Sequence, residues 1–87
     1  MTTIVTSIAA NDVRKLTTNG NRYWLYSISG TGTEIEVKTN QNTYLPHKAK
    51  TGCNFKQEFT ELLLKNNTGA SVDVVMIVGF DEYVDYS

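Results

Sequence analysis

The segment from Val72 to Phe80 constrains the fold of this chain more than any other feature of the sequence. Successive side chains of an extended strand point to opposite faces of a sheet. One face of this segment would carry four apolar side chains: Val72, Val74, Met76 and Val78. Val75 and Ile77 make the opposite face apolar as well. A strand that is apolar on both faces lies in the centre of a sheet or is covered by another subunit.

The chain offers little other material with which to cover that segment. Its 87 residues are enough for one small domain, 1–87, with a single core. A domain of this size buries only about 60% of the surface that its unfolded chain exposes. Association with other copies or with a partner would therefore add stability by covering the second apolar face.

The rest of the sequence has the composition of strands and turns rather than of helices. Thr and Asn are abundant and the aliphatic positions favour Val and Ile, which suit pleated strands. Turn signals recur roughly every 8–12 residues, which is typical of small sandwiches and barrels. The sequence predicts an all-β fold, a small antiparallel β-sandwich of jelly-roll-like form with six to seven short strands. We expect strands over these segments: 12–17, 22–29, 33–38, 43–45, 59–66 and 72–80.

The segment 22–29 is the clearest aromatic strand. It follows Asn19 and Gly20, a pair that favours a turn because both residues tolerate positive φ. Alternation would divide its side chains into two sets, namely Trp24, Tyr26 and Ile28 on one face and Tyr23, Leu25 and Ser27 on the other. Both faces would then carry large apolar groups, and both are candidates for burial.

The segment 33–38 has a simpler alternation. Ile35 and Val37 would point inward while the charged residues between them face water, as in an antiparallel strand with one wet face. We expect Pro46 to end the short strand at 43–45, because proline cannot donate to a ladder. The polar segment 47–54 is then expected to be a loop.

The segment 55–65 permits two interpretations. Phe55, Phe59 and Leu62 have helical spacing, but the run is short and stops at Asn66 and Asn67. We favour a strand over 59–66 and keep a short helix as the alternative. A hairpin loop over 66–71 would follow, and its glycosylation sequon is interpreted as a turn because no secretion signal is evident.

The two ends of the sequence are the least regular. Residues 1–19 are expected to form an N-terminal arm plus a first strand, and 80–87 an acidic, aromatic tail. We expect no secretory signal and no membrane span, because the sequence has no basic cluster leading into an apolar core and no run of about 18 apolar residues. The single cysteine, Cys53, cannot close an intrachain disulfide, which favours synthesis in a reducing cytosol.

Few side chains could support catalysis or bind a metal. Cys53 and His47 are the one conceivable nucleophile–base pair, but no acid is evident to orient the imidazole. One His and one Cys are too few for a zinc site. We therefore expect a protein that is not an enzyme and that has no cofactor and no metal.

Two further motifs have structural interpretations. The acids of the tail, Asp81, Glu82 and Asp85, lack the ligand spacing of a calcium loop and are interpreted as a solvated tail. The glycines around Thr31 lack the Lys and the helix that a phosphate loop needs, so this segment is interpreted as a turn.

Charge argues against nucleic acid as the partner. Lys plus Arg is 8 and Asp plus Glu is 9, which gives a net charge of −1 with His neutral. A chain so close to neutral is a poor ligand for a polyphosphate. The segment 22–26 places an arginine beside aromatic residues, as single-strand binders do, but few cations flank it, so a buried aromatic strand is the preferred interpretation.

Three segments from Gly20 onward carry a family resemblance. The matching features are the aromatic strand after a glycine in 20–26, the strand that opens with Phe59 and ends in Asn66, and a closing strand, 70–85, in which Val78-Gly79-Phe80 leads into acids. Together they resemble the small β-sandwich, virion-associated proteins of tailed bacteriophages. The resemblance covers about two thirds of the chain and leaves out its first nineteen residues.

The resemblance implies a structural role in a virion. It favours a capsid decoration (cement) protein that binds the capsid as a homo-oligomer, with a trimer favoured, after synthesis in the host cytoplasm. A tail or head–tail connector accessory protein is the alternative. A small carbohydrate-binding adsorption module is a further alternative, in which Trp24, Tyr23 or Tyr26 would stack on a sugar face. Side chains expected to contact neighbouring subunits are Ile4, Val5, Ile8, Trp24, Tyr26, Phe80, Tyr83 and Tyr86.

Overall fold

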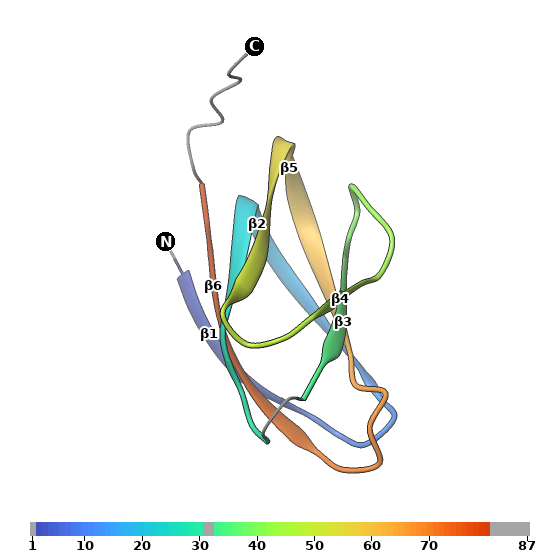
Figure 1. The fold of residues 1–87 in the computed structure, drawn as a ribbon. Helices are drawn as coiled ribbons and strands as arrows, with labels where there is room; N and C mark the ends of the chain where they lie inside the picture. Colours follow the sequence, from blue (N-terminus) through green and yellow to red (C-terminus); the bar gives the residue numbers. More distant parts are fainter. Residues whose placement is uncertain (1, 31–32, 81–87) are drawn as a thin grey trace.

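The computed structural model describes residues 2–30 and 33–80, which form one curled antiparallel sheet (Figure 1). It has six strands: β1 (Thr2–Ile8), β2 (Val13–Ile28), β3 (Ile35–Thr39), β4 (Leu45–His47), β5 (Thr51–Lys65) and β6 (Val72–Gly79). Their order across the sheet is β1-β6-β2-β5-β3-β4, and every neighbouring pair is antiparallel. The predicted small antiparallel all-β fold is confirmed.

The strand pairing is nested. β1 pairs with β6, β2 with β5, and β3 with β4, so the chain is arranged as one long hairpin that is rolled up. Nested pairing of this kind underlies the jelly roll. It also explains why segments far apart in the sequence, such as β1 and β6, lie side by side at one margin of the sheet (Figure 1).

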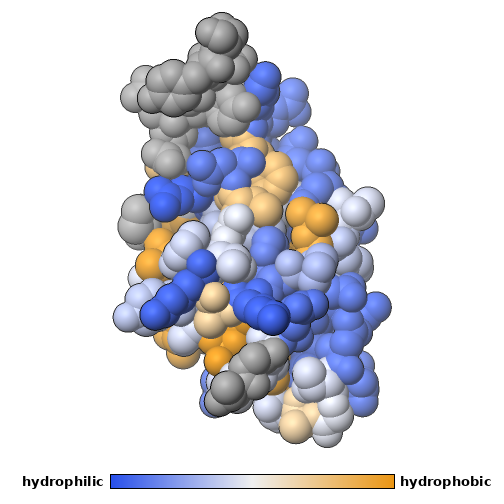
Figure 2. All heavy atoms as spheres, in the orientation of Figure 1, coloured by the Kyte–Doolittle hydropathy of each residue, from blue (hydrophilic) through white to orange (hydrophobic). Residues whose placement is uncertain are grey.

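The concave side of the curled sheet, called the inner face below, holds a single hydrophobic core. Every strand except β4 contributes to its buried apolar side chains, which are Ile8, Tyr23, Leu25, Ile28, Ile35, Val37, Phe59, Leu62, Leu64, Val72, Val74, Met76 and Val78. The inward positions of Ile35 and Val37 confirm the predicted alternation of this segment. Apolar patches also remain outside, where they are separated by hydrophilic side chains in Figure 2.

β6 lies between β1 and β2, as a strand that is apolar on both faces requires. The predicted division of its side chains is correct. Val74 and Met76 are completely buried on the inner face, whereas Val75 and Ile77 are half-buried on the opposite side. The second apolar face of β6 is therefore only partly covered.

The predicted turn at Asn19 and Gly20 is wrong, because both residues lie inside the continuous strand β2. The register of β2 against β5 shifts on either side of Gly20. A Cβ at this position would lie 2.6 Å from the carbonyl oxygen of Gly79. Gly20 therefore allows the backbones of β2 and β6 to approach closely. Because the chain does not turn here, the strands predicted at 12–17 and 22–29 are parts of one strand of 16 residues.

A bulge at Tyr26 corrects the predicted faces of β2. Leu25 pairs with Met76 and Ser27 with Val75, so Tyr26 is an extra residue without an opposite partner. The one inserted residue shifts every later side chain of β2 to the face opposite the predicted one. Ile28 is therefore in the core instead of sharing a face with Trp24.

The segment 55–65 is a strand, which confirms the favoured interpretation over the helix. β5 nevertheless begins at Thr51, so most of the predicted loop at 47–54 is strand. Gly52 has the structural role of a close-contact residue, because a Cβ there would collide with the carbonyl oxygen of Tyr23 and lie 2.9 Å from Cα of Trp24. Polar composition misled the prediction because this half of β5 pairs with β2 and has mainly exposed side chains.

The two edge strands also differ from expectation. Pro46 does not end a strand but lies within β4, where an edge position makes its missing N–H harmless. The N-terminal arm expected within residues 1–19 is not a free arm, because β1 pairs with β6 along its entire length. Its inward side chain Ile8 is 1% exposed and belongs to the core.

The connection from β5 to β6 is not a hairpin, because β2 lies between these two strands. Asn66, which is completely buried, organises this connection. Its side-chain amide donates hydrogen bonds to the carbonyl oxygens of Ile8 (3.1 Å), Ala9 (3.1 Å) and Ala70 (2.8 Å). Its Oδ1 accepts from the backbone N–H of Thr68, so the sequon asparagine is a structural residue of the turn.

Candidate functional site

One candidate site is a polar cluster at the margin of the core, where β4 meets β5. Nε2 of His47 lies 2.7 Å from the hydroxyl of Tyr23 and 3.9 Å from Sγ of Cys53. Nδ1 of the same ring lies 3.3 Å from Oγ1 of Thr51, which donates to the carbonyl oxygen of Lys48 at 2.7 Å. The fold therefore does bring His47 and Cys53 together.

The hydrogen bonds in this cluster fit a neutral imidazole. The Thr51 hydroxyl gives its proton to a carbonyl, so it accepts from Nδ1–H, and the Tyr23 hydroxyl then donates to the Nε2 lone pair. Burial lowers the pKa of His47, although the charge of Glu34 opposes this effect. Burial is also the main reason that the pKa of Tyr23 is raised above its usual range.

This cluster lacks the arrangement that nucleophilic catalysis needs. The ring nitrogen nearest Cys53 already accepts a hydrogen bond from Tyr23, and the other faces a threonine rather than a carboxylate. A base must have a free lone pair within reach of its nucleophile. Within residues 2–30 and 33–80, no three His, Cys, Asp or Glu side chains lie close enough together to hold a metal ion. The cluster is best explained as a satisfied polar margin of the core.

The second candidate is the convex side of β1, β6 and β2, called the outer face below. It is defined by four apolar side chains: Val5, Trp24, Val75 and Ile77. In the ladders Val5 lies opposite Val75, and Ile77 lies opposite Trp24. Val5 is 75% exposed, and the other three are half-buried. Three neighbouring strands thus carry a connected apolar row on the side away from the core.

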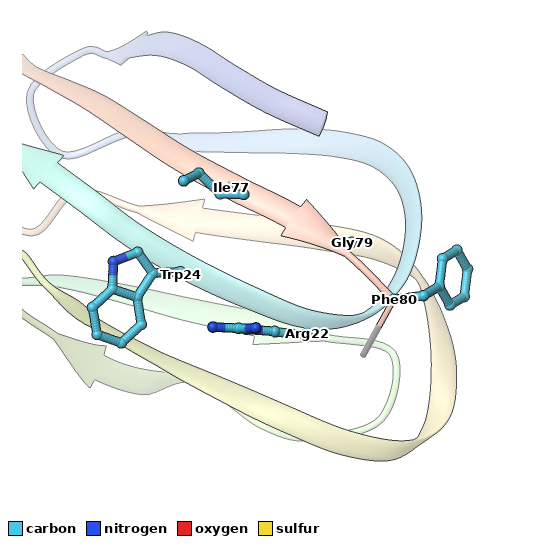
Figure 3. Close-up of a pocket in the computed structure, with 5 residues that line it drawn as sticks. All are labelled: Arg22, Trp24, Ile77, Gly79 and Phe80. Carbon is cyan, nitrogen blue, oxygen red and sulfur yellow. The ribbon is translucent and has the colours of Figure 1, made fainter. Parts of the chain in front are cut away.

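A groove lies at one end of the outer face, between β2 and β6 (Figure 3). Five residues line its volume of about 250 Å³, which are Arg22, Trp24, Ile77, Gly79 and Phe80. In the close-up Trp24 and Phe80 lie at opposite ends and the side chain of Arg22 extends along β2 between them. Gly79, opposite Arg22 in the ladder, has no side chain to fill the space. The groove is therefore an apolar hollow with one cationic side chain.

Gly52 allows the indole of Trp24 to lie against β5. The two residues are opposite each other in the ladder, and a Cβ on Gly52 would lie 3.1 Å from Cε3 of the indole. The ring is consequently held by the sheet and half-buried, whereas the side chain of Phe80 is 65% exposed. The groove has one fixed aromatic wall and one exposed aromatic wall.

The predicted contact residues divide into three groups. Val5, Trp24, Tyr26 and Phe80 have exposed or half-exposed side chains, and Trp24 and Phe80 line the same groove. Ile8 is inside the core and Ile4 packs against it, so these two face inward. Tyr83 and Tyr86 lie outside the described residues, as do the tail acids Asp81, Glu82 and Asp85.

Sequence reasoning did not assign Arg22, Ile77 and Gly79 to a site, although the groove depends on all three. The apolar second face of β6 was a usable signal for Ile77. No sequence signal placed Arg22 opposite Gly79, because this requires the β2–β6 register. Tyr23, one of the rings considered for sugar stacking, is 1% exposed and cannot contact a ligand at the surface.

Comparison with known proteins returned no similar family model, curated protein or solved structure for this chain. Among the residues that the structure describes, no helix is long and apolar enough to cross a membrane.

Proposed function

We propose that this protein is a non-enzymatic structural subunit that works by docking the outer face of β1, β6 and β2 onto other protein subunits. The observation that carries the proposal is the apolar row formed by Val5, Val75, Ile77 and Trp24 on the side of the sheet away from the core. A connected apolar patch bordered by polar residues is typical of a protein–protein contact.

The composition of the groove favours a protein as the partner. Its walls are mostly apolar, and aromatic and arginine side chains are the types enriched where partners bind most strongly. A side chain of the partner can enter between Trp24 and Phe80 with little rearrangement, since Trp24 is already held against Gly52. Preorganisation of this kind lowers the entropic cost of binding.

The assembly that we propose is a tailed-phage virion, in which the chain decorates and stabilises the capsid as a homo-oligomer. This finer proposal is supported by the resemblance of residues 20–85 to virion-associated β-sandwich proteins. A tail or head–tail accessory position is the alternative within the same class. Both positions use the same docking face.

The groove also keeps a sugar-binding adsorption module as a second candidate. The half-buried indole of Trp24 borders an open hollow, where a ring can stack on a sugar face. Sugars need several hydrogen-bonding side chains beside the ring. Arg22 is the single side chain of that kind in the lining, so the groove suits an apolar protein side chain better.

Occupancy on purified particles tests the proposal. We expect the chain in mass spectra of intact virions, and we expect deletion to lower their resistance to heat or osmotic shock. Phe80→Ser should reduce occupancy at least tenfold, because it removes the exposed wall of the groove. Leu45→Ser is the control, since Leu45 is a 39% exposed side chain on β4, which pairs with neither β2 nor β6 and does not line the groove.

Absence of the chain from particles contradicts the virion role. Equal loss of occupancy in both variants contradicts the assigned docking face. Binding of the purified protein to immobilised glycans, abolished by Trp24→Ala and unaffected by Leu45→Ser, would favour the sugar-binding candidate instead.

A further inference from the structure

The sheet has two edges, and they are built differently. The β4 edge is three residues long and contains Pro46, and short length and proline are devices that discourage strand addition. The β1 edge is seven residues long, with the sequence TTIVTSI. It has no charge, no proline and no glycine, and the β1–β6 pairing has no bulge. One edge is protected and the other is open.

The open edge of β1 has backbone groups available for a further strand. Of the strands that the structure describes, β6 alone pairs with β1, and the two are in register from Thr2 to Ile8. The pairing of β1 with β6 is regular over all seven residues and contains no bulge that would bend the edge away from a partner. An uncharged extended edge of this length is a template for another strand.

The sequence of β1 is complementary to itself about its central residue. In an antiparallel pair centred on Val5, Thr3 lies opposite Ser7 of the second copy, and Ile4 lies opposite Thr6. No like charges meet anywhere along this register. Threonine–serine pairs and β-branched pairs are favourable across strands.

Val5 is the residue that gains most from this register. It is the most exposed large apolar side chain of the described chain, at 75%, and it points to the outer face beside Val75. In the centred register the two Val5 side chains face each other across the two-fold axis and cover one another. The two outer faces then lie on the same side of one continuous sheet.

We propose that a second copy of this chain pairs with the open edge of β1, antiparallel and centred on Val5, to form a two-fold dimer with a continuous sheet. The contact is isologous, because each copy uses the same edge. This contact closes as a dimer, whereas the resemblance to phage proteins favours a trimer. The proposal rests on the oligomerisation in the proposed function, but not on the virion as its location.

The pairing adds to the docking surface. The rows that contain Val5, Val75 and Ile77 are joined across the two-fold axis into one surface of twice the width. Each groove, bordered by Trp24, remains open, because it lies between β2 and β6 rather than at β1. A dimer would therefore offer two identical grooves to a partner, which raises its overall affinity through avidity.

Cysteine cross-linking tests the register. In the proposed dimer the two copies of residue 5 are directly opposite each other, at a Cα separation of about 4.5–5.5 Å that a disulfide can span. Residue 7 points to the same face, but its two copies are offset by four residues along the strands, or about 14 Å at roughly 3.4 Å per residue. Under one mild oxidant Val5→Cys should give covalent dimer at least tenfold faster than Ser7→Cys.

Sedimentation of the full chain without oxidant gives an independent result. The wild-type chain should sediment as a dimer at high concentration. Val5→Lys should sediment as a folded monomer, because it places two charges opposite each other on the edge. Leu45→Lys is the control, since it makes the same type of change on the protected edge, and it should remain a dimer.

A wild-type monomer or trimer, or equal cross-linking of the two cysteine variants, would overturn the proposed dimer. Occupancy of the chain on capsids is measured separately and does not depend on these outcomes. If particles carry the chain but the purified protein forms no β1-mediated dimer, this inference fails and the proposed function stands. If the dimer forms and particles lack the chain, the virion role fails and the dimer stands.

Discussion

The inner and outer faces of β6 and its neighbours both carry apolar side chains, but the two faces are buried to different extents. On the inner face Val74 and Met76 are completely buried by the curl of the sheet. On the outer face Val75 and Ile77 alternate with them and stay half-buried, and Val5 on the adjoining strand is 75% exposed. Apolar composition therefore does not decide burial within one strand. The curvature of the sheet decides which side becomes the core.

A strand that is apolar on both faces can serve two purposes. Inner side chains stabilise the fold, because their transfer from water is completed within the monomer. Outer side chains keep surface that only association can remove from water. Substitutions on the inner face should therefore affect unfolding, and those on the outer face should affect binding.

The largest expected effect is a difference in stability between variants of two phenylalanines, Phe59 and Phe80. Phe59→Ala should lower the free energy of unfolding by about 3–5 kcal/mol, because it leaves a cavity in the packed core. Phe80→Ala should change it by less than about 0.5 kcal/mol, because Phe80 is 65% exposed. Urea unfolding of both variants checks this prediction. Similar losses of stability would contradict the division into two faces.

Glycine substitution tests how the outer face is supported. Gly52→Ala should cost about 1–3 kcal/mol, because its Cβ would press on the backbone and the indole of Trp24. Gly69→Ala is the control, since nothing lies within 4 Å of the position of its Cβ. Thermal unfolding monitored by Trp fluorescence reports both stability and the environment of the indole. A neutral Gly52→Ala would show that the indole does not pack as described.

Asn66 tests the polar connection at one end of the inner face. Asn66→Ala removes an amide that donates to three carbonyl oxygens, and we expect a loss of about 1–3 kcal/mol. Asn67→Ala removes an exposed side chain that bonds Glu36, and it should cost less than about 0.5 kcal/mol. Chemical denaturation compares the two. Equal effects would contradict a specific role for Asn66.

The smallest effect concerns His47. Because burial lowers its pKa, the folded protein favours the neutral ring, while the unfolded chain gains a proton near the usual value of 6.5. Its contribution to stability is complete above pH 6.5 and is lost as the pH falls below that value. His47→Gln should reduce the slope of stability between pH 6.5 and the lower, folded pKa. An unchanged slope would contradict a neutral buried ring.

The segments that the sequence predicted best are 33–38 and 72–80, in which side chains alternate without interruption along the strand. The segment of Ile35 and Val37 was assigned correctly because polar residues mark the outward side. The length of β2 was missed, because a glycine for close backbone contact resembles a glycine for a turn. The bulge at Tyr26 was missed because it depends on pairing with β6. Pairing register is a tertiary property that alternation in one strand does not contain.

Only part of the candidate site was predicted, because the rest of it also depends on pairing register. Trp24 and Phe80 stand out in a sequence because aromatic side chains are common at interfaces. Arg22 and Gly79 do not stand out, because their role depends on being opposite each other across the β2–β6 ladder. Ile8 was placed at a contact surface because its segment was expected to be an arm, and pairing with β6 turns it inward.

Dependence of unfolding on protein concentration tests most directly whether surface outside the core is reserved for association. A hundredfold excess of partner over its dissociation constant stabilises a folded protein by about 2.7 kcal/mol. The unfolding midpoint of the wild-type chain should therefore rise with its own concentration, while that of Val5→Lys should stay constant. A wild-type midpoint that does not change with concentration, in a chain that sediments as a monomer, would contradict association between copies of the chain.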